Sequence, residues 1–312
     1  TTRQYTMARR AVYITLGSEN AQYGDALPTF SWSYSGSSAS NDNNKFVDGI
    51  SENDAIYDIS AAVSTEVLNG TTYIVSPQGS YDITAQIAAG YTDILANYNV
   101  SITNGKLTVS PRAITVQIEA TSSTYGEAEA TIGYSLTDST SLYAGDTAAE
   151  VFTITAGVTS TSAVGDYAVT LTNVKGANYY TITLANDGAS GLTVDDLYTV
   201  TNATITDVSV TPTTGLVYNG ADQFSGAFTE SATTVNNMEQ KWTFSLTQDG
   251  TYSETLTLKD AGTYTIYYKI TADNHNEYSS GSSCFTVVIG KASLTVTVTG
   301  TAKRPPNTAS IR

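Results

Sequence analysis

One short motif occurs four times along the 312-residue chain, and its spacing limits the size of the unit that can fold. Each occurrence ends an alternating apolar segment, passes through a short polar step and begins the next segment at an alanine. These alanines lie at positions 11, 113, 203 and 292, which are 102, 90 and 89 residues apart. Steps of this length suit small β domains, because solenoid repeats measure about 20–45 residues. The sequence therefore predicts three tandem domains, each large enough to bury its own core.

The same spacing predicts where the domains begin and end. We expect the last strand of a preceding unit at 1–10, domains at 11–110, 111–197 and 198–291, and the first strand of a following unit with a tail at 292–312. The two incomplete ends carry apolar residues at strand spacing, and unpaired apolar edges recruit other strands. Five residues are therefore candidates for strand exchange between copies: Tyr5, Met7, Leu294, Val296 and Val298.

Alternation of apolar and polar residues with a period of two dominates the domains. The segments 12–16 and 114–118 show it most clearly, which places their apolar side chains on one face of a half-buried strand. A Gly-x-Tyr segment occurs once in each domain, at 79–81, 165–167 and 262–264. A tyrosine at the start of such a strand is typical of a tyrosine corner, in which the phenol hydroxyl holds a neighbouring loop.

Three segments of the first domain are less regular. Residues 52–65 fit a short helix or a strand equally well, and the polar residues 37–44 predict an exposed loop. Asn-Gly at 104–105, before an alternating apolar segment, predicts a hairpin. The fold class that follows is all-β, with three tandem β-sandwich, Ig-like domains in an elongated array. Units resembling the β-grasp fold with a short helix remain the alternative.

Composition excludes several classes of partner. The formal net charge is −15, which disfavours nucleic acids and anionic membrane surfaces because both need clustered Lys and Arg. No apolar run approaches the roughly 18 residues of a membrane-spanning helix. The single cysteine, Cys284, cannot form an internal disulfide and fits a small strand residue. These features predict an acidic extracellular surface with no nucleic-acid partner and no membrane insertion in this segment.

The residues that usually support catalysis are scarce. The one histidine, His275, lies in a polar turn and is expected to be a solvated turn residue. Zinc sites need several His or Cys ligands, and no Gly-x-Ser-x-Gly nucleophile segment occurs. We therefore expect no enzyme activity and no cofactor. Asp195 and Asp196, at the joint between the second and third domains, are weak candidates for a Ca²⁺ site that would stiffen it.

The order of short motifs in the first two domains carries a resemblance. Tyr-Gly-Asp at 23–25 and Tyr-Gly-Glu at 125–127 each begin eleven residues after the start of the first strand. Each domain then continues with Gly-x-Tyr, with Asn-Tyr at 97–98 or 178–179, and with a closing strand. This order resembles the MBG-type (Tyr-Gly-x) repeats that occur in tandem in large bacterial surface and adhesin-like proteins. The resemblance implies an exported, cell-attached array.

The third domain lacks the Tyr-Gly-Asp/Glu motif in register. It carries Val-Tyr-Asn-Gly at 217–220 and a strand at 262–269, followed by a polar turn at 272–277. It resembles a companion Ig-like repeat of the same surface proteins.

The leading functional hypothesis is a non-catalytic stalk or spacer of a bacterial surface adhesin or fibrous surface protein. Its partners would be neighbouring repeats or other copies of itself, with a host or environmental glycan or protein beyond them. One alternative is a self-assembling extracellular filament subunit joined by strand exchange. Another is a carbohydrate-binding module that uses Trp32 and Trp242. Both tryptophans alternate with apolar residues, which favours core-facing positions.

Overall fold

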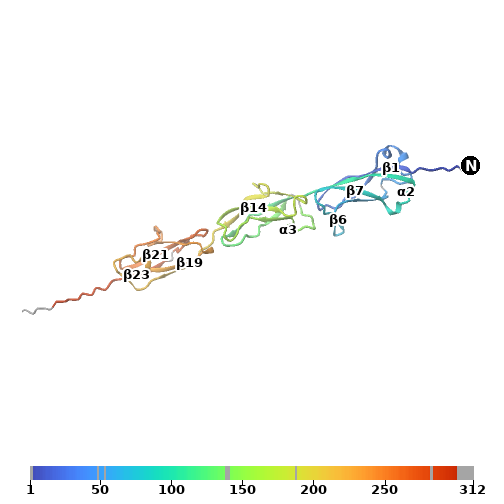
Figure 1. Ribbon diagram of the computed structural model, residues 1–312. Helices are drawn as coiled ribbons and strands as arrows, with labels where there is room; N and C mark the ends of the chain where they lie inside the picture. The colour runs from blue at the N-terminus through green and yellow to red at the C-terminus, as the bar shows by residue number, and fades with distance from the viewer. Residues whose placement is uncertain are drawn as a thin grey trace, which may run out of the picture. The chain divides into compact units, whose positions relative to one another are not determined.

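The computed structural model describes residues 3–47, 49–52, 54–137, 141–186, 188–281 and 284–300. Most of the regular structure in this part of the chain is strand (Figure 1). The chain forms two compact units. Unit 1 consists of Thr1–Ser123, Glu129–Val158 and Gly165–Thr199, and unit 2 of Thr124–Ala128, Thr159–Val164 and Val200–Arg312. The last twelve residues of the predicted tail, 301–312, lie outside the described residues.

The first repeat, blue to turquoise in Figure 1, belongs to unit 1. Its strands are β1 (Arg10–Leu16), β2 (Glu19–Gln22), β3 (Trp32–Tyr34), β4 (Tyr57–Ala61), β5 (Thr65–Leu68), β6 (Thr71–Ile74), β7 (Gly79–Ile87), β8 (Tyr98–Thr103) and β9 (Gly105–Ser110).

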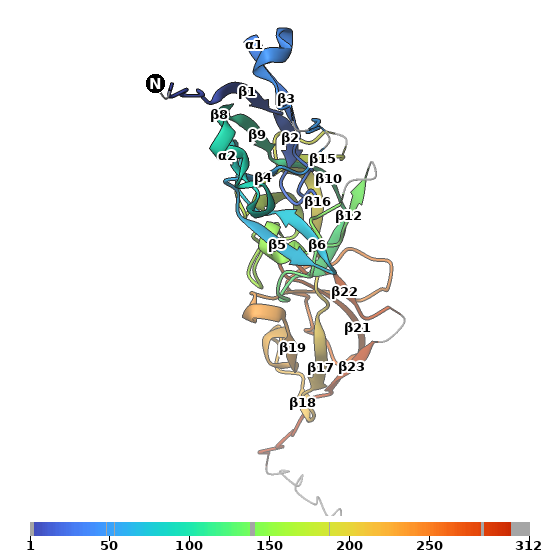
Figure 2. The same ribbon diagram turned by 90° about the vertical axis from the view of Figure 1, so that its right-hand side faces the viewer.

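These strands form two layers around one core. β1 is central in the first layer, because it pairs antiparallel with β3 and parallel with β8 (Figure 2). The second layer has the order β2-β9-β7-β4, and β5 and β6 form a separate hairpin. The alternating side chains of Val12, Ile14 and Leu16 are buried between the layers, together with Ile83 and Leu107. The apolar residues of the period-two pattern thus lie on the core-facing side of β1, as predicted.

The second repeat has the same plan. Its strands are β10 (Arg112–Ile118), β11 (Thr121–Thr124), β12 (Tyr134–Thr137), β13 (Phe152–Thr155), β14 (Gly165–Asn173), β15 (Tyr180–Leu184) and β16 (Thr193–Thr201). The central strand β10 pairs antiparallel with β12 and parallel with β15, as β1 does with β3 and β8. The opposite layer has the order β11-β16-β14-β13. The first two repeats of the sequence therefore share one strand topology.

The third repeat lies in unit 2. Its strands are β17 (Thr206–Pro212), β18 (Leu216–Val217), β19 (Phe228–Thr233), β20 (Lys241–Ser245), β21 (Gly262–Thr271), β22 (Tyr278–Ser279) and β23 (Phe285–Gly290). β17 pairs with β19, and the other layer has the order β18-β23-β21-β20, with β22 beside β21. Buried side chains of both layers form its core, including Phe228, Phe244, Ile266 and Val287.

The helical segments in the described part of the chain have three or four residues each. They are α1 (Ser37–Ser40), η1 (Asp42–Asn44), η2 (Ala89–Tyr91), α2 (Ile94–Asn97), α3 (Ala148–Val151), η3 (Phe224–Gly226) and η4 (Val235–Asn237). Elements of this length cannot form the helical layer that the β-grasp alternative needs. The prediction of tandem β-sandwich domains is confirmed.

Two of the irregular segments of the first repeat are resolved by the structure. The strand reading of 52–65 is correct, since β4 lies there and pairs antiparallel with β7. The loop predicted at 37–44 is partly wrong, because α1 and η1 occupy most of it. The buried Ser38 explains the short helix: its hydroxyl donates to the Asn44 carbonyl at 2.5 Å and accepts the Tyr13 N–H at 2.7 Å.

The hairpin predicted at Asn104-Gly105 is wrong. β8 ends just before this dipeptide and β9 begins at Gly105, but β8 pairs with β1 while β9 pairs with β7 and β2. The chain therefore crosses from one layer to the other at this point. Gly105 has a different purpose, because a Cβ there would lie 2.2 Å from the carbonyl oxygen of Gly17.

Two of the three predicted tyrosine corners are confirmed, and the one at Tyr167 stays a prediction. The hydroxyl of Tyr81 donates to the carbonyl of Pro77, and that of Tyr264 donates to the carbonyl of Asp260, both at 2.8 Å. Each bond ties the start of a long strand to the loop four residues earlier. Cys284 was expected inside a strand but lies exposed just before β23.

Candidate functional site at the joints between repeats

The residues proposed from sequence for metal binding and strand exchange are all exposed. Asp195 and Asp196 are exposed on β16, and the described residues contain no group of three or more His, Cys, Asp or Glu side chains placed to hold a metal ion. The five strand-exchange candidates lie outside the strands, with exposed fractions between 73% and 92%: Tyr5, Met7, Leu294, Val296 and Val298. Both proposals stay predictions.

The two tryptophans differ in their surroundings. Trp32 is 6% exposed and packs edge-on against the rings of Tyr34 and Tyr57, which confirms the core-facing prediction. Trp242 is half-buried against the core of the third repeat and also lines a groove of about 880 Å³ beside Glu230. For Trp242 the prediction is therefore only partly correct.

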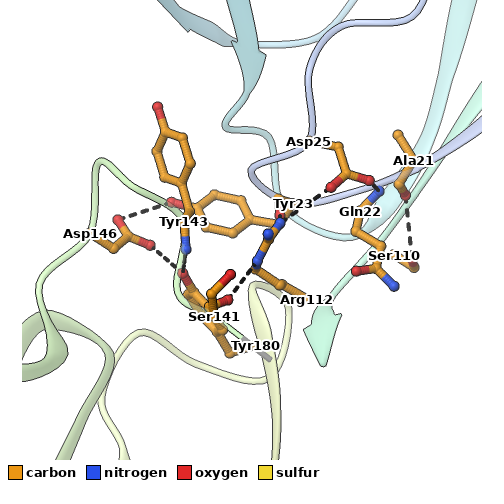
Figure 3. A network of polar contacts seen from close by, with 10 residues as sticks. All are labelled: Ala21, Gln22, Tyr23, Asp25, Ser110, Arg112, Ser141, Tyr143, Asp146 and Tyr180. Atoms are coloured by element: carbon orange, nitrogen blue, oxygen red, sulfur yellow. Dashed lines mark hydrogen bonds and ion pairs between the residues drawn. The ribbon is translucent and has the colours of Figure 1, made fainter. Parts of the chain in front are cut away.

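The polar and aromatic side chains gather instead where one repeat meets the next. The first such joint lies wholly within unit 1 and starts from the Tyr-Gly-Asp turn (Figure 3). β2 runs parallel to β9, and directly after it the Tyr23 N–H donates to the carbonyl of Ser110 at 2.9 Å. Asp25 closes the turn, because its carboxylate accepts the Gln22 N–H at 2.8 Å. Gly24 supplies the positive φ of 76° that the turn requires.

The ring of Tyr23 projects into the second repeat. Its centroid lies 5.7, 5.2 and 5.5 Å from those of Tyr143, Tyr179 and Tyr180, and all three contacts are edge-on. The ammonium group of Lys175 lies 5.1 Å from the same centroid. Tyr23 is only 2% exposed. Edge-on aromatic pairs contribute about 0.5–1.5 kcal/mol each beyond their buried area, so this ring makes a large share of the joint.

A carboxylate at the centre of the joint organises the hydroxyl groups. Asp146, whose side chain is 5% exposed, accepts hydrogen bonds from Tyr23 at 3.2 Å and from Tyr180 at 2.8 Å, and it forms an ion pair with Lys175. The hydroxyl of Tyr180 in turn accepts the Tyr143 N–H at 3.0 Å. Three donors compensate the loss of water around this carboxylate.

An arginine joins the turn to the second repeat from the other side. Arg112 begins β10 and donates from Nε to the carbonyl of Ser141 at 2.9 Å. Its Nη1 donates to the carbonyl of Tyr23 at 3.1 Å and to the Asp25 carboxylate at 3.2 Å. Because the arginine is mostly buried, this bridge is screened less than a surface pair. Arg112 thus holds the backbone and the acid of the turn together.

The phenol groups of the joint are held in their protonated form. Burial, together with the nearby Asp146 carboxylate, raises the pKa of Tyr23 and of Tyr180. Burial and a hydrogen bond to Glu66 raise the pKa of Tyr143 to about 12. Protonated hydroxyls are the donors that Asp146 and Glu66 need.

The second Tyr-Gly-acid turn is built in the same way, within unit 2. The Tyr125 N–H donates to the carbonyl of Thr201 at 2.8 Å, and the Glu127 carboxylate closes the turn by accepting the Thr124 N–H at 3.0 Å. Gly126 has a positive φ of 97°. The Tyr125 ring is buried edge-on against the imidazole of His275, 5.7 Å between centroids.

His275 is a structural residue of this joint. It is 8% exposed, so the expectation of a solvated turn residue is wrong. Its Nε2 accepts the Val235 N–H at 2.9 Å, and its Nδ1 lies 2.8 Å from the carbonyl of Asp273. An Nε2 that accepts requires a neutral ring with the proton on Nδ1, which then donates to Asp273. The burial comes from residues far away in sequence, which is why the polar turn gave no sign of it.

A comparison with protein families finds a match for one part of the chain. Residues 114–189 match the family model described as MBG domain (YGX type). Together with the repeated topology, this defines a tandem β-sandwich repeat protein. The matched range covers most of the second repeat and includes Tyr125, Gly126 and Glu127.

Two solved structures align with most of the chain at low TM-scores. One is the crystal structure of Drosophila N-cadherin EC1-3, at 8% identity and a TM-score of 0.23, covering 89% of this chain and 99% of that one. The other is Drosophila N-cadherin EC1-4, at 8% identity and a TM-score of 0.20, covering 89% and 74%. A comparison with curated proteins finds no match. In the described part of the chain no helix has the length and apolar character needed to cross a membrane.

We predict that Tyr23→Ala destabilises unit 1 by about 3–5 kcal/mol, the range typical of a buried aromatic residue cut to alanine. Tyr23→Phe should cost about 1–3 kcal/mol, because only the hydrogen bond to Asp146 is lost. Calorimetric and denaturant unfolding measure both. Tyr91→Ala, which removes an exposed ring of the same repeat, is the matched control. Equal effects of Tyr23→Ala and Tyr91→Ala would contradict the role of the joint.

Unit 1 should also lose stability in alkali. The folded pKa values of Tyr23, Tyr143 and Tyr180 lie above that of an exposed phenol, about 10. Their contribution is therefore complete below about pH 10 and is lost as the pH rises through the folded pKa values. Near-ultraviolet absorbance should show exposed tyrosines ionising first and these three only at higher pH. Ionisation of every tyrosine in one step, with the fold intact, would disprove it.

We expect His275→Ala to destabilise unit 2 by about 1–3 kcal/mol, because the Val235 N–H is left partly buried without its acceptor. Asn276→Ala, at an exposed position of the same turn, is the matched control and should change the free energy of unfolding by less than about 0.5 kcal/mol. Thermal unfolding followed by circular dichroism measures both. A neutral His275→Ala variant would mean that the imidazole bears no part of the packing.

Proposed function

We propose that this chain is a non-catalytic spacer segment of an extracellular bacterial surface protein. Its function is to hold successive β domains in a fixed order and orientation. The observation that carries the proposal is the Tyr-Gly-acid turn. In both places where the turn occurs, its tyrosine is buried against the following repeat.

The chemistry of the joints supports a mechanical role. Asp146 is nearly buried, yet its oxygens are engaged by Tyr23, Tyr180 and Lys175. A carboxylate satisfied by three donors at a packed surface fixes geometry, whereas a catalytic carboxylate must face a substrate. The connection between β9 and β10 is also short, with Pro111 alone between them. So short a link leaves little freedom for the two repeats to separate.

The family match and the composition support the location. The first two repeats resemble the MBG-type (Tyr-Gly-x) repeats of exported bacterial surface proteins, and residues 114–189 match that family model. The net charge of −15 suits an acidic, solvated exterior. The partners would then be neighbouring repeats, with a glycan or protein ligand held elsewhere in the parent molecule. Ca²⁺ at Asp195 and Asp196 remains a candidate stiffening ion for the second joint.

A second candidate is a filament subunit joined by strand exchange. One observation favours it: residues 294–298 repeat the alternation of 114–118, yet Leu294, Val296 and Val298 are exposed while Ile114 and Val116 are buried. An exposed alternating apolar segment is a template for pairing with another chain. Concentration-dependent fibres in electron microscopy that disappear when residues 292–300 are deleted would favour this candidate over the spacer.

The spacer function predicts a rod-like particle. Small-angle X-ray scattering of the full chain should give a long maximum dimension that does not change between low and high salt. The ring contacts of the first joint are apolar and its polar contacts are mostly buried, so salt screens them little. The double variant Tyr23→Ser, Arg112→Ala should broaden the distance distribution, since both sides of the first joint are lost. Tyr91→Ser with Lys106→Ala is the control away from the joint. A compact globule for the unaltered chain would refute the spacer function.

A further inference from the structure

The two Tyr-Gly-acid turns approach their neighbours so closely that no side chain fits at the glycine. A Cβ at Gly24 would lie 2.6 Å from the Cβ of Tyr143, and a Cβ at Gly126 would lie 2.1 Å from Cγ1 of Val235. Real Cβ atoms do not reach these distances, so alanine would push the following repeat away. The glycine therefore serves the contact as well as the turn. The same turn has been fitted to two different neighbours.

The surface that receives Tyr23 has a recognisable plan. Arg112 and Tyr180 are opposite each other in the parallel pairing of β10 and β15. The Tyr180 hydroxyl accepts the N–H of Tyr143. This bond holds Tyr143 in place, and Gly24 packs against Tyr143. Arg112 reaches the turn itself. We call Arg112, Tyr143 and Tyr180 the second-repeat socket.

The first repeat carries the same plan at its own N-terminal end. Arg10 and Tyr98 are opposite each other in the parallel pairing of β1 and β8. The Tyr98 hydroxyl accepts the N–H of Val47 at 2.9 Å, just as Tyr180 accepts that of Tyr143. Arg10 donates from Nε to the carbonyl of Asn43 in η1, and Arg112 likewise donates to the carbonyl of Ser141. We call Arg10, Val47 and Tyr98 the first-repeat socket.

The described residues place no Tyr-Gly-acid turn in the first-repeat socket. It borders a groove of about 370 Å³, which is also lined by Met7, Arg9 and Asn97. Val47 is 60% exposed there, whereas its counterpart Tyr143 is 2% exposed under Tyr23. An exposed apolar residue beside two arginines is the complement of a turn that presents an aromatic ring and a carboxylate.

We propose that the first-repeat socket binds the Tyr-Gly-Asp or Tyr-Gly-Glu turn of another MBG-type domain, one that uses residues 5–8 as its closing strand. In sequence Tyr5 and Met7 correspond to Leu107 and Val109 of β9. Val109 pairs with Ala21, two residues before Tyr23, so the closing strand and the turn arrive together. The proposal rests on the proposed function, because it extends the same stack of repeats by one domain.

The chemistry of this joint would differ from that of the first one. Asn97 stands at the position of Tyr179, so one ring contact is absent, and Arg9 stands at the position of Pro111, so one cation is added. The carboxylate of the incoming turn would therefore contribute more, through Arg9 and Arg10, and the ring less. In a chain with net charge −15, two adjacent arginines are a local exception that selects an acidic turn.

The test extends the full chain by a second copy of residues 10–106 placed directly before Tyr5. Arg10 of the first-repeat socket is changed to Ala, Asp25 of the added copy is changed to Asn, and the two changes are combined. We expect the effects on the unfolding equilibrium constant to be non-additive by about threefold or more, as for a close charged pair. Arg10→Ala should also cost more in the extended chain than in the original one.

A second extended chain, with Tyr5→Leu and Met7→Val, matches the residues of β9 and guards against a closing strand that packs poorly. Additive effects in a folded extended chain would overturn the proposal, and so would failure of the added copy to fold in both versions. The same set of single and combined substitutions, made at Arg112 and Asp25 of the original chain, distinguishes failure of the first-repeat socket from failure of the spacer function. Coupling at that joint alone leaves the spacer function standing and removes only the socket, whereas coupling at neither joint removes both.

Discussion

The contact of Tyr23 with Asp146 is the interaction on which the order of the first two repeats depends. A nearly buried carboxylate is costly unless donors surround it, and two tyrosine hydroxyls and one ammonium group do so here. One of those donors comes from the preceding repeat. Separating the repeats would therefore expose a ring that is 2% exposed and remove a donor from the carboxylate at the same time. The joint is stable because separating the two repeats would break its apolar and its polar contacts at the same time.

The joint needs no helix or strand of its own, because it uses strands that also build the core of a repeat. The first strand of each of the first two repeats runs parallel to a strand from late in the same repeat, and the pairing sets an arginine opposite a buried tyrosine. In the second repeat the apolar face of that strand forms the core, while Arg112 at its start contacts the first repeat. Packing inside a domain and docking between domains thus share one strand, so a change of register would disturb both.

The sequence predicted those features whose partners are close along the chain or periodic. The strands at 12–16 and 114–118 follow from alternation alone, and the corners of Tyr81 and Tyr264 bond only four residues away. The hairpin at Asn104-Gly105 failed because the dipeptide is a local signal, while β8 pairs with β1 at the far end of the repeat. The tyrosine of the 23–25 turn was noticed as a motif, but its hydroxyl partner Asp146 is 123 residues away. His275 failed for the same reason, since Val235 lies 40 residues earlier.

The two joints also show where the specificity of such an array resides. The turn is constrained by its own folding, because its glycine needs a positive φ and its acid must accept the N–H three residues earlier. It has little freedom left to distinguish one neighbour from another. The receiving surfaces are free to differ, and they do: tyrosines and a carboxylate surround Tyr23, whereas a valine and a neutral imidazole meet the second turn. Of the two sides of each joint, the turn is therefore the constant one and the receiving surface is the one that differs.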